Sequence, residues 1–345
     1  MGYLQSYNLT MERDIGRGTV LEIGFVGSKG THLGRQYNIN QPFRTVENFR
    51  ISSTFPVPYA PFGTINYWDF GSNSIYNAGQ VTLRRRLFNA LTYRLSYSYS
   101  KSIDNNSQFT GNSTGGFAQA LDSRNLSLER ARSDWDRGHV VTASYSWQLP
   151  VGRGRRWLTN PTKVVNGLLG GWQLSGTATF YTGAPITVLD STINAALGES
   201  SRPNRIASGK DVTGSGKRGV DYPWFDPAAF VHTAACTQSG SGAARKTSCP
   251  TDPYGFVPFA PGNSGRGILD GPGRQAINAS LLKNFVVGER KTVQLRWETF
   301  NIFNHPNFLL PNRNYNETAA GAIDNVADSG QGGPRVMQFA LRYQF

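Results

Sequence analysis

The stretch SDWDRGHVV holds the closest grouping of acid and base side chains in the sequence. Asp134, Asp136 and His139 fall within this single stretch. Two carboxylates beside an imidazole could supply general acid and base catalysis, as in a hydrolase. The same carboxylates could instead cap the junction between a loop and a strand and pair with Arg132 or Arg137. We favour this second, structural interpretation of the stretch.

Other reactive side chains are scattered along the chain. The four histidines lack the spacing of metal ligands, and they are His32, His139, His232 and His305. The glycines of GRGRRW are not followed by a helix pattern, so they do not predict a phosphate-binding loop. We therefore predict no catalytic residue, no metal site and no cofactor, and the protein is not expected to be an enzyme.

The chain is strongly basic, with 35 Lys and Arg, 22 Asp and Glu, and a formal net charge of +13. Such a charge could indicate binding to nucleic acid. However, the basic cluster LRRRLF lies in an alternating strand pattern and VGRGRRW lies in a turn, and neither belongs to a nucleic-acid motif. No nucleic-acid partner is expected.

Apolar residues make up 38% of the 345 residues, and the mean hydropathy is -0.40. No apolar run approaches the roughly 18 residues that a spanning helix needs, which excludes a helical membrane protein. Spanning strands need only about 9–11 residues with alternate positions apolar, a pattern that hydropathy averaging hides.

Strand patterns recur along the whole chain. In LTYRLSYSYS, Leu or Tyr alternates with Thr, Arg or Ser over residues 91–100, and QVTLRRRLF precedes it across a tight turn. Similar alternation occurs in stretches near the start, at 140–149, 171–183, 277–285 and 292–300, and at the end. The sequence predicts an all-β, antiparallel fold of about nine strands, each of about ten residues.

The connections between these strands alternate in length. Short ones are expected at 14–17, 88–90, 150–170 and 288–290, and long ones at 29–75, 103–137, 183–274 and 304–334. All long connections then lie at one end, as in outer-membrane barrels with short periplasmic turns and long extracellular loops. A soluble β-sandwich would give no reason for this asymmetry. We predict part of a transmembrane β-barrel.

The polar face of these strands would line the barrel lumen. Five charged residues are predicted to point inward and pair across strands, namely Arg84, Arg86, Arg94, Arg296 and Glu298.

The chain ends on the alternating stretch RVMQFALRYQF, whose apolar positions include Phe345, Tyr343, Leu341 and Phe339. An apolar strand edge is a pairing hazard unless it is covered, and barrel closure removes such edges. This ending favours a barrel.

Two features are expected in the loops. Cys236 and Cys249 lie in a Gly-, Ser- and Pro-rich stretch, which favours one disulfide in an oxidising compartment over two free thiols. Five loop aromatics could stack on a sugar ligand or pack within the loops, and we favour packing; these are Tyr222, Trp224, Phe225, Tyr254 and Phe256.

Several stretches together resemble the C-terminal barrel portion of TonB-dependent outer-membrane receptors. The resemblance is strongest to Oar-like receptors that carry an N-terminal carboxypeptidase-regulatory-like domain. It rests on YNAGQVTLRRR, LTYRLSYSYSKSID, DRGHVVTASYSWQLPVGRGRRW, GGWQLSGTATFYTGAPITV, GILDGPGRQAINASLLKNF, RWETFNIFNHPNF and the final aromatic strand.

The resemblance implies a location in the bacterial cell outer membrane, in contact with its lipid. It also implies a plugged barrel of about 22 strands, of which residues 1–345 would be the C-terminal part. The plug domain, the N-terminal strands and the signal sequence would then lie outside these residues. The terminal Phe345 would be part of the signal that the barrel-assembly machinery reads, and TonB would bind through the missing N-terminal region.

The expected function is uptake of a nutrient ligand such as an oligosaccharide, a peptide or a metal chelate. The alternative is an outer-membrane surface protein without transport, either an adhesin or a hydrolase at the barrel rim.

Overall fold

The computed structural model describes residues 1–51, 55–86, 91–107, 120–190, 202–209, 221–232, 236–240, 244–287, 291–327 and 332–345. The short turns expected at 88–90 and 288–290 lie outside these described residues. Parts of the long loops expected at 29–75, 103–137, 183–274 and 304–334 also lie outside them.

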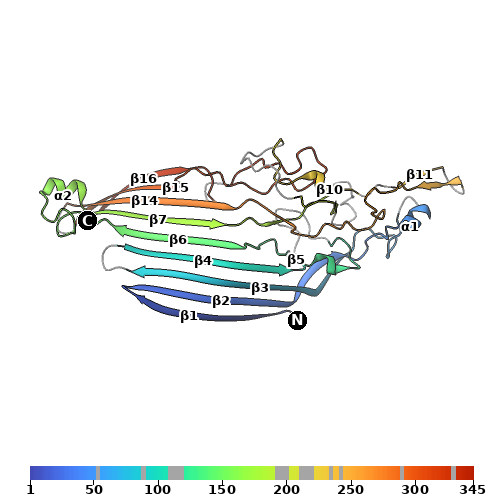
Figure 1. The fold of residues 1–345 in the computed structure, drawn as a ribbon, viewed down its shortest axis with the longest axis horizontal. Helices are drawn as coiled ribbons and strands as arrows, with labels where there is room; N and C mark the ends of the chain where they lie inside the picture. The colour runs from blue at the N-terminus through green and yellow to red at the C-terminus, as the bar shows by residue number, and fades with distance from the viewer. Residues whose placement is uncertain are drawn as a thin grey trace.

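One broad antiparallel sheet makes up most of the described structure (Figure 1). Its long strands lie in the order in which they follow one another along the chain, and β5 (Ala131–Arg132) pairs beside β4. The long strands are β1 (Tyr3–Gly16), β2 (Thr19–Asn38), β3 (Asn66–Arg86), β4 (Leu91–Asp104), β6 (His139–Gln148), β7 (Trp172–Tyr181), β14 (Arg274–Val286), β15 (Thr292–Phe300) and β16 (Val336–Gln344).

Short elements occupy the connections. Figure 1 shows helix α2 beyond one end of the long strands, and α1, β10 and β11 beyond the other. The helices are α1 (Val46–Ile51) and α2 (Lys163–Leu169), and 3-10 turns occur at Leu126–Glu129 and Pro227–Ala229. The short strands form three pairs, which are β8 (Pro185–Ile186) with β13 (Leu269–Asp270), β9 (Asn204–Arg205) with β10 (Phe230–Val231), and β11 (Thr237–Ser239) with β12 (Lys246–Ser248).

The strand register places apolar residues opposite apolar residues. Leu83 of β3 lies opposite Leu95 of β4, and Trp297 of β15 lies opposite Phe339 of β16. Because side chains alternate between the two faces of a strand, this register creates one apolar and one polar face across the sheet.

The two longest strands exceed the predicted length by the most. β2 has 20 residues and β3 has 21, whereas a spanning strand needs about 9–11 residues. An ion pair and an aromatic contact hold the two extended parts together. The Arg35 guanidinium lies 2.6 Å from the Asp69 carboxylate, and Tyr37 packs edge-on against Tyr67. The pairing therefore continues into the region expected to be a loop.

Burial in this structure is opposite to that of a soluble sheet protein. The apolar face of the sheet is exposed, with Leu9 75% and Phe339 79% accessible. The apolar core lies instead within the loops, where Ile186, Val188 and Phe230 are almost fully buried. Exposed apolar strands beside a buried loop core are what a lipid-facing sheet requires.

The sheet is open. β1 and β16 are the two ends of the strand order, and they do not pair with each other in the described part of the chain. The structure is therefore not a closed barrel. Among the described residues, no helix is long and apolar enough to cross a membrane.

Candidate functional site

The polar face of the sheet carries the charged residues selected from the sequence. Arg84 of β3 lies directly opposite Arg94 of β4, and Arg296 and Glu298 lie on the same face of β15. Arg86 occupies the next position of that face on β3, but its side chain lies outside the described residues. This face is a surface of charged and hydroxyl side chains.

Charge pairing on the polar face is incomplete. Arg84 reaches across β2, and its Nη2 lies 2.5 Å from Glu12 Oε1, with both side chains about half exposed. An exposed ion pair of this kind contributes only about 0–1 kcal/mol. Arg94 forms no ion pair with any residue that the structure describes. Like charges directly opposite each other are unfavourable, so this position favours water or an anion.

The last two strands are joined on the same face. Gln338 of β16 donates a hydrogen bond to Glu298 of β15, and the Arg296 guanidinium lies 3.7 Å from the same carboxylate. Glu298 therefore has partners both on its own strand and on its neighbour.

A pocket of about 820 Å³ lies where the sheet meets the loops. Its walls include Tyr99, Arg132, Asp136, His139 and Arg274, contributed by four strands and the loop before β6. Two of the three residues of the SDWDRGHVV stretch thus line one pocket.

Both carboxylate oxygens of Asp136 accept hydrogen bonds from neighbouring protein groups. One oxygen accepts a hydrogen bond from Arg132 Nε at 2.9 Å, and the other accepts from the Ser102 backbone N–H at 2.7 Å. Arg132 also contacts Asp270 at 2.6 Å. Burial lowers the pKa of Arg132, but its hydrogen bonds to Asp270 and Asp136 outweigh burial and raise that pKa above its ordinary value. These are the contacts that the structural interpretation predicts.

His139 has a different environment. Its Nδ1 lies 2.8 Å from the Tyr97 hydroxyl, and its ring lies 5.0 Å from that of Tyr99. No hydrogen bond joins His139 to Asp136 within the described residues. Asp134 donates its backbone N–H to Ser107. The three residues therefore do not form an acid and base relay, and no group of three metal-binding side chains occurs among the residues described.

The loop aromatics divide into two groups. Phe225 is 1% exposed within the loop core, and Trp224 packs against that core and donates its indole N–H to the Asp270 carbonyl. Tyr222 and Tyr254 are exposed, and the Tyr254 ring lies 6.2 Å from that of Phe256. Only the exposed members are available to a ligand.

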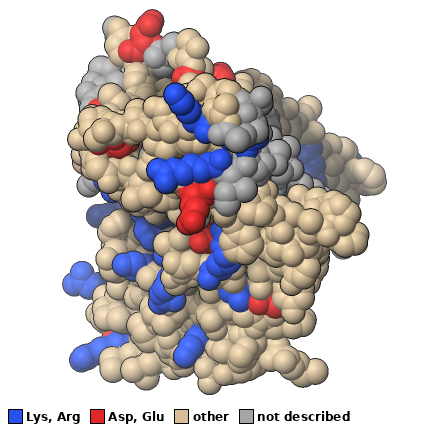
Figure 2. All heavy atoms as spheres, turned by 90° about the vertical axis from the view of Figure 1, so that its right-hand side faces the viewer, with Lys and Arg blue, Asp and Glu red and all other residues tan. Residues whose placement is uncertain are grey.

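Long-range ion pairs join the loops, and sequence reasoning missed them. The Arg202 guanidinium lies 3.0 Å from the Glu129 carboxylate, and both side chains are buried. Burial lowers the pKa of Arg202, while the Glu129 carboxylate opposes this effect. Viewed from the loop end, acidic and basic side chains lie next to one another (Figure 2). No local pattern could reveal partners so distant in sequence.

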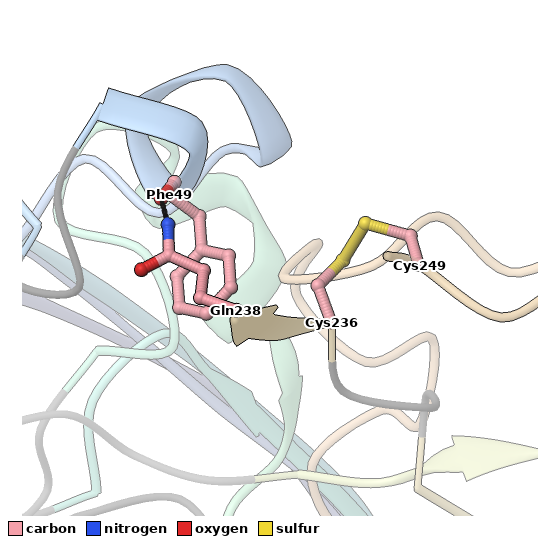
Figure 3. Close-up of a disulfide and its surroundings, with 4 residues drawn as sticks. All are labelled: Phe49, Cys236, Gln238 and Cys249. Atoms are coloured by element: carbon pink, nitrogen blue, oxygen red, sulfur yellow. Dashed lines mark hydrogen bonds between the residues drawn. A yellow bond between two sulfur atoms is a disulfide. The ribbon is translucent and has the colours of Figure 1, made fainter. Parts of the chain in front are cut away.

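Cys236 and Cys249 are joined in a disulfide beside the hairpin β11–β12. Figure 3 shows that the Gln238 amide of this hairpin donates a hydrogen bond to the Phe49 carbonyl of α1. The disulfide joins the two ends of the hairpin, and the Gln238 hydrogen bond attaches the hairpin to the loop that follows β2.

The terminal strand β16 pairs with β15 and is exposed along its length. The Trp297 and Phe339 rings stack 6.4 Å apart, and the Tyr343 and Phe345 rings stack 5.7 Å apart. Leu341 is 71% exposed and Phe345 is 90% exposed. These residues form a continuous apolar edge.

The model of the outer membrane β-barrel domain family matches residues 1–338. The chain belongs to this family. The protein is therefore located in the bacterial outer membrane. In outer-membrane barrels the apolar strand face turns to lipid and the polar face turns to the lumen.

Among solved structures, the outer membrane transporter YddB from Escherichia coli is similar to this chain at 8% sequence identity, with a TM-score of 0.47. The similarity covers 100% of this chain and 33% of the transporter, so the chain spans about a third of that protein's length. No curated protein sequence matches the chain.

Proposed function

We propose that this chain is the C-terminal barrel portion of a TonB-dependent receptor that takes up a nutrient ligand. The observation that carries the proposal is the polar face, on which Arg84 and Arg94 lie opposite each other and, among the described residues, Arg84 forms an ion pair while Arg94 forms none. A charged, hydrated inner face suits the passage of a polar solute.

The loop end supports the same proposal. Its pocket of about 820 Å³ is lined by cationic, acidic and aromatic side chains, and pockets of this size hold small ligands. The sequence resemblance suggests an oligosaccharide, a peptide or a metal chelate. It also suggests a complete barrel of about 22 strands, with TonB bound through a region N-terminal to these strands.

Uptake by cells that express the complete receptor tests the proposal. We expect growth on one ligand class of a panel of oligosaccharides, peptides and metal chelates, and we expect this growth to require TonB. Arg94→Glu should lower uptake while the amount of receptor in the membrane stays unchanged. Uptake without TonB would contradict the proposal. Adhesion or hydrolysis that needs no TonB would favour the alternative, a surface protein without transport.

A further inference from the structure

The connection between β6 and β7 is unusually basic. Residues 149–171 contain Arg153, Arg155, Arg156 and Lys163, and they contain no Asp or Glu. All four cationic side chains are exposed. None forms an ion pair with a residue that the structure describes. This connection, which we call the basic turn, lies at the end of the sheet opposite the long loops (Figure 1).

The basic turn also exposes large apolar side chains. Five of them are between 45% and 73% accessible, and these are Trp157, Leu158, Val164, Leu168 and Leu169. Exposed apolar groups beside unpaired cations are the composition of a segment that lies at a membrane interface.

The basic turn is held together by its own hydrogen bonds. The Arg153 backbone N–H donates to the Asn166 side chain at 2.7 Å, and the Thr162 hydroxyl caps α2 by accepting from the Val165 N–H. A Cβ on Gly152 would lie only 2.9 Å from the Gly170 Cα, so the two ends of the turn pack closely. Its exposed side chains are therefore displayed from a defined backbone.

Two contacts place the basic turn on the lipid side of the sheet. Trp172 of β7 and Lys283 of β14 lie opposite each other on the apolar face. The Trp172 indole donates to the Leu168 carbonyl at 2.9 Å, and Lys283 donates to the Gly170 carbonyl. Because both donors belong to the lipid-facing row, the C-terminal end of α2 lies over the lipid-facing surface.

We propose that the basic turn binds anionic phospholipid of the periplasmic leaflet. Arg153, Arg155 and Arg156 would contact phosphate groups, while Trp157 and Leu168 enter the boundary between headgroups and acyl chains. The proposal rests on the orientation that the loop lengths indicate, with the short turns in the periplasm. Each cation near an anionic surface adds to the attraction, and the apolar side chains add to it through burial.

The test uses the complete receptor of the proposed function, in nanodiscs that contain phosphatidylethanolamine with or without phosphatidylglycerol. Native mass spectrometry counts the phospholipid that remains bound after release from the disc. We expect preferential retention of phosphatidylglycerol. The variant with Arg153→Gln, Arg155→Gln and Arg156→Gln should bind it about fivefold more weakly for each charge removed.

A control variant removes three exposed cations at the loop end, through Arg50→Gln, Arg130→Gln and Lys246→Gln. It makes the same change in net charge and should retain phosphatidylglycerol as the wild type does. If both triple variants lose the same amount of bound phosphatidylglycerol, the proposal is overturned, because the effect would then come from net charge alone. Unchanged retention in the first variant would also overturn it.

Quenching of Trp157 fluorescence gives a second readout. Brominated phospholipids quench a tryptophan only when it lies within the bilayer. The amount of fluorescence lost to quenching should therefore be smaller in Trp157→Phe than in the wild type. If the two proteins are quenched equally, the basic turn does not enter the lipid, and a periplasmic protein becomes the better candidate for its partner.

Discussion

The Nζ atom of Lys283 lies 5.3 Å from the centroid of the Trp172 ring, in the apolar row of the sheet. It also lies 5.1 Å from the Phe285 ring centroid, and Lys283 is only 1% exposed. An ammonium group in a lipid-facing row is costly unless it is satisfied. Here two aromatic rings and the Gly170 carbonyl satisfy it, and the same contacts attach the β6–β7 connection to the sheet.

Replacing Lys283 should loosen that connection. Lys283→Met keeps the side-chain volume but removes the cation–π contacts and the hydrogen bond. This change should weaken the attachment of the β6–β7 connection to the sheet by about 1 kcal/mol. Cleavage by trypsin at Arg153, Arg155 or Arg156, followed by mass spectrometry, should become about fivefold faster. Lys101→Met, on the same face but away from α2, is the control. Equal cleavage rates in wild type and Lys283→Met would contradict the prediction.

The buried pair Glu129–Arg202 should stabilise the loop core. Glu129→Gln leaves the Arg202 charge buried without its carboxylate, which typically costs about 3–5 kcal/mol. Hydrogen exchange of the amides at 121–130 should accelerate. Glu47→Gln, the same change at an exposed position, should have no effect.

The combination of Glu129→Leu with Arg202→Met should slow hydrogen exchange of the amides at 121–130 back toward the wild-type rate, because neither charge then remains buried. If these amides exchange as fast in the double variant as in Glu129→Gln, the pair acts through something other than its charges.

The Cys236–Cys249 disulfide closes a loop with a sequence separation of 13 residues. On the chain-entropy model, such a bridge contributes about 2–3 kcal/mol to the stability of the hairpin β11–β12. Intact-mass measurement with and without reductant should show a gain of two hydrogens on reduction. Free thiols in protein isolated without reductant would refute the pairing.

Tyr315 should make the loop core sensitive to alkaline pH. Burial, together with the nearby Asp190 carboxylate, raises the pKa of Tyr315 well above its ordinary value of 10.0. The unfolded chain therefore ionises first. The stability that Tyr315 contributes is complete below pH 10 and is lost as the pH rises above it.

Absorbance of tyrosinate, measured for wild type and for Tyr315→Phe, tests this dependence. The tyrosinate absorbance of the wild type minus that of Tyr315→Phe should stay constant through pH 10 and rise only when the loop core opens. A difference curve with its midpoint at pH 10 would mean that Tyr315 is not protected.

Phe345 should matter for assembly more than for the stability of the folded sheet. It is 90% exposed and contacts Tyr343 of its own strand, so its loss removes little packing. Deletion of Phe345 from the complete protein should lower its amount in the outer membrane, as expected if the barrel-assembly machinery reads this residue. Wild-type amounts of folded, heat-modifiable barrel in the deletion variant would argue against this role.

The sequence alone determined where the long strands lie and which of their side chains share a face, although not how far β2 and β3 extend. Residues such as Leu95, Tyr97 and Tyr99 alternate with serines, and this alternation is a local property because successive side chains point to opposite sides of a strand. When the apolar positions of all strands are assigned to one face, the same rule predicts that Arg84, Arg94 and Arg296 share the opposite face, and the register agrees. The exposed apolar row follows from it as well.

The tertiary structure alone decided which distant groups meet. Glu129 and Arg202 lie 73 residues apart, and nothing local links them. Lys283 breaks the apolar row in sequence, and only the pairing of β14 with β7 brings it to Trp172. Helix α2 is too short to show a clear helical period. The physical reason is that loop contacts depend on where the sheet holds the loop ends, whereas strand alternation depends only on adjacent residues.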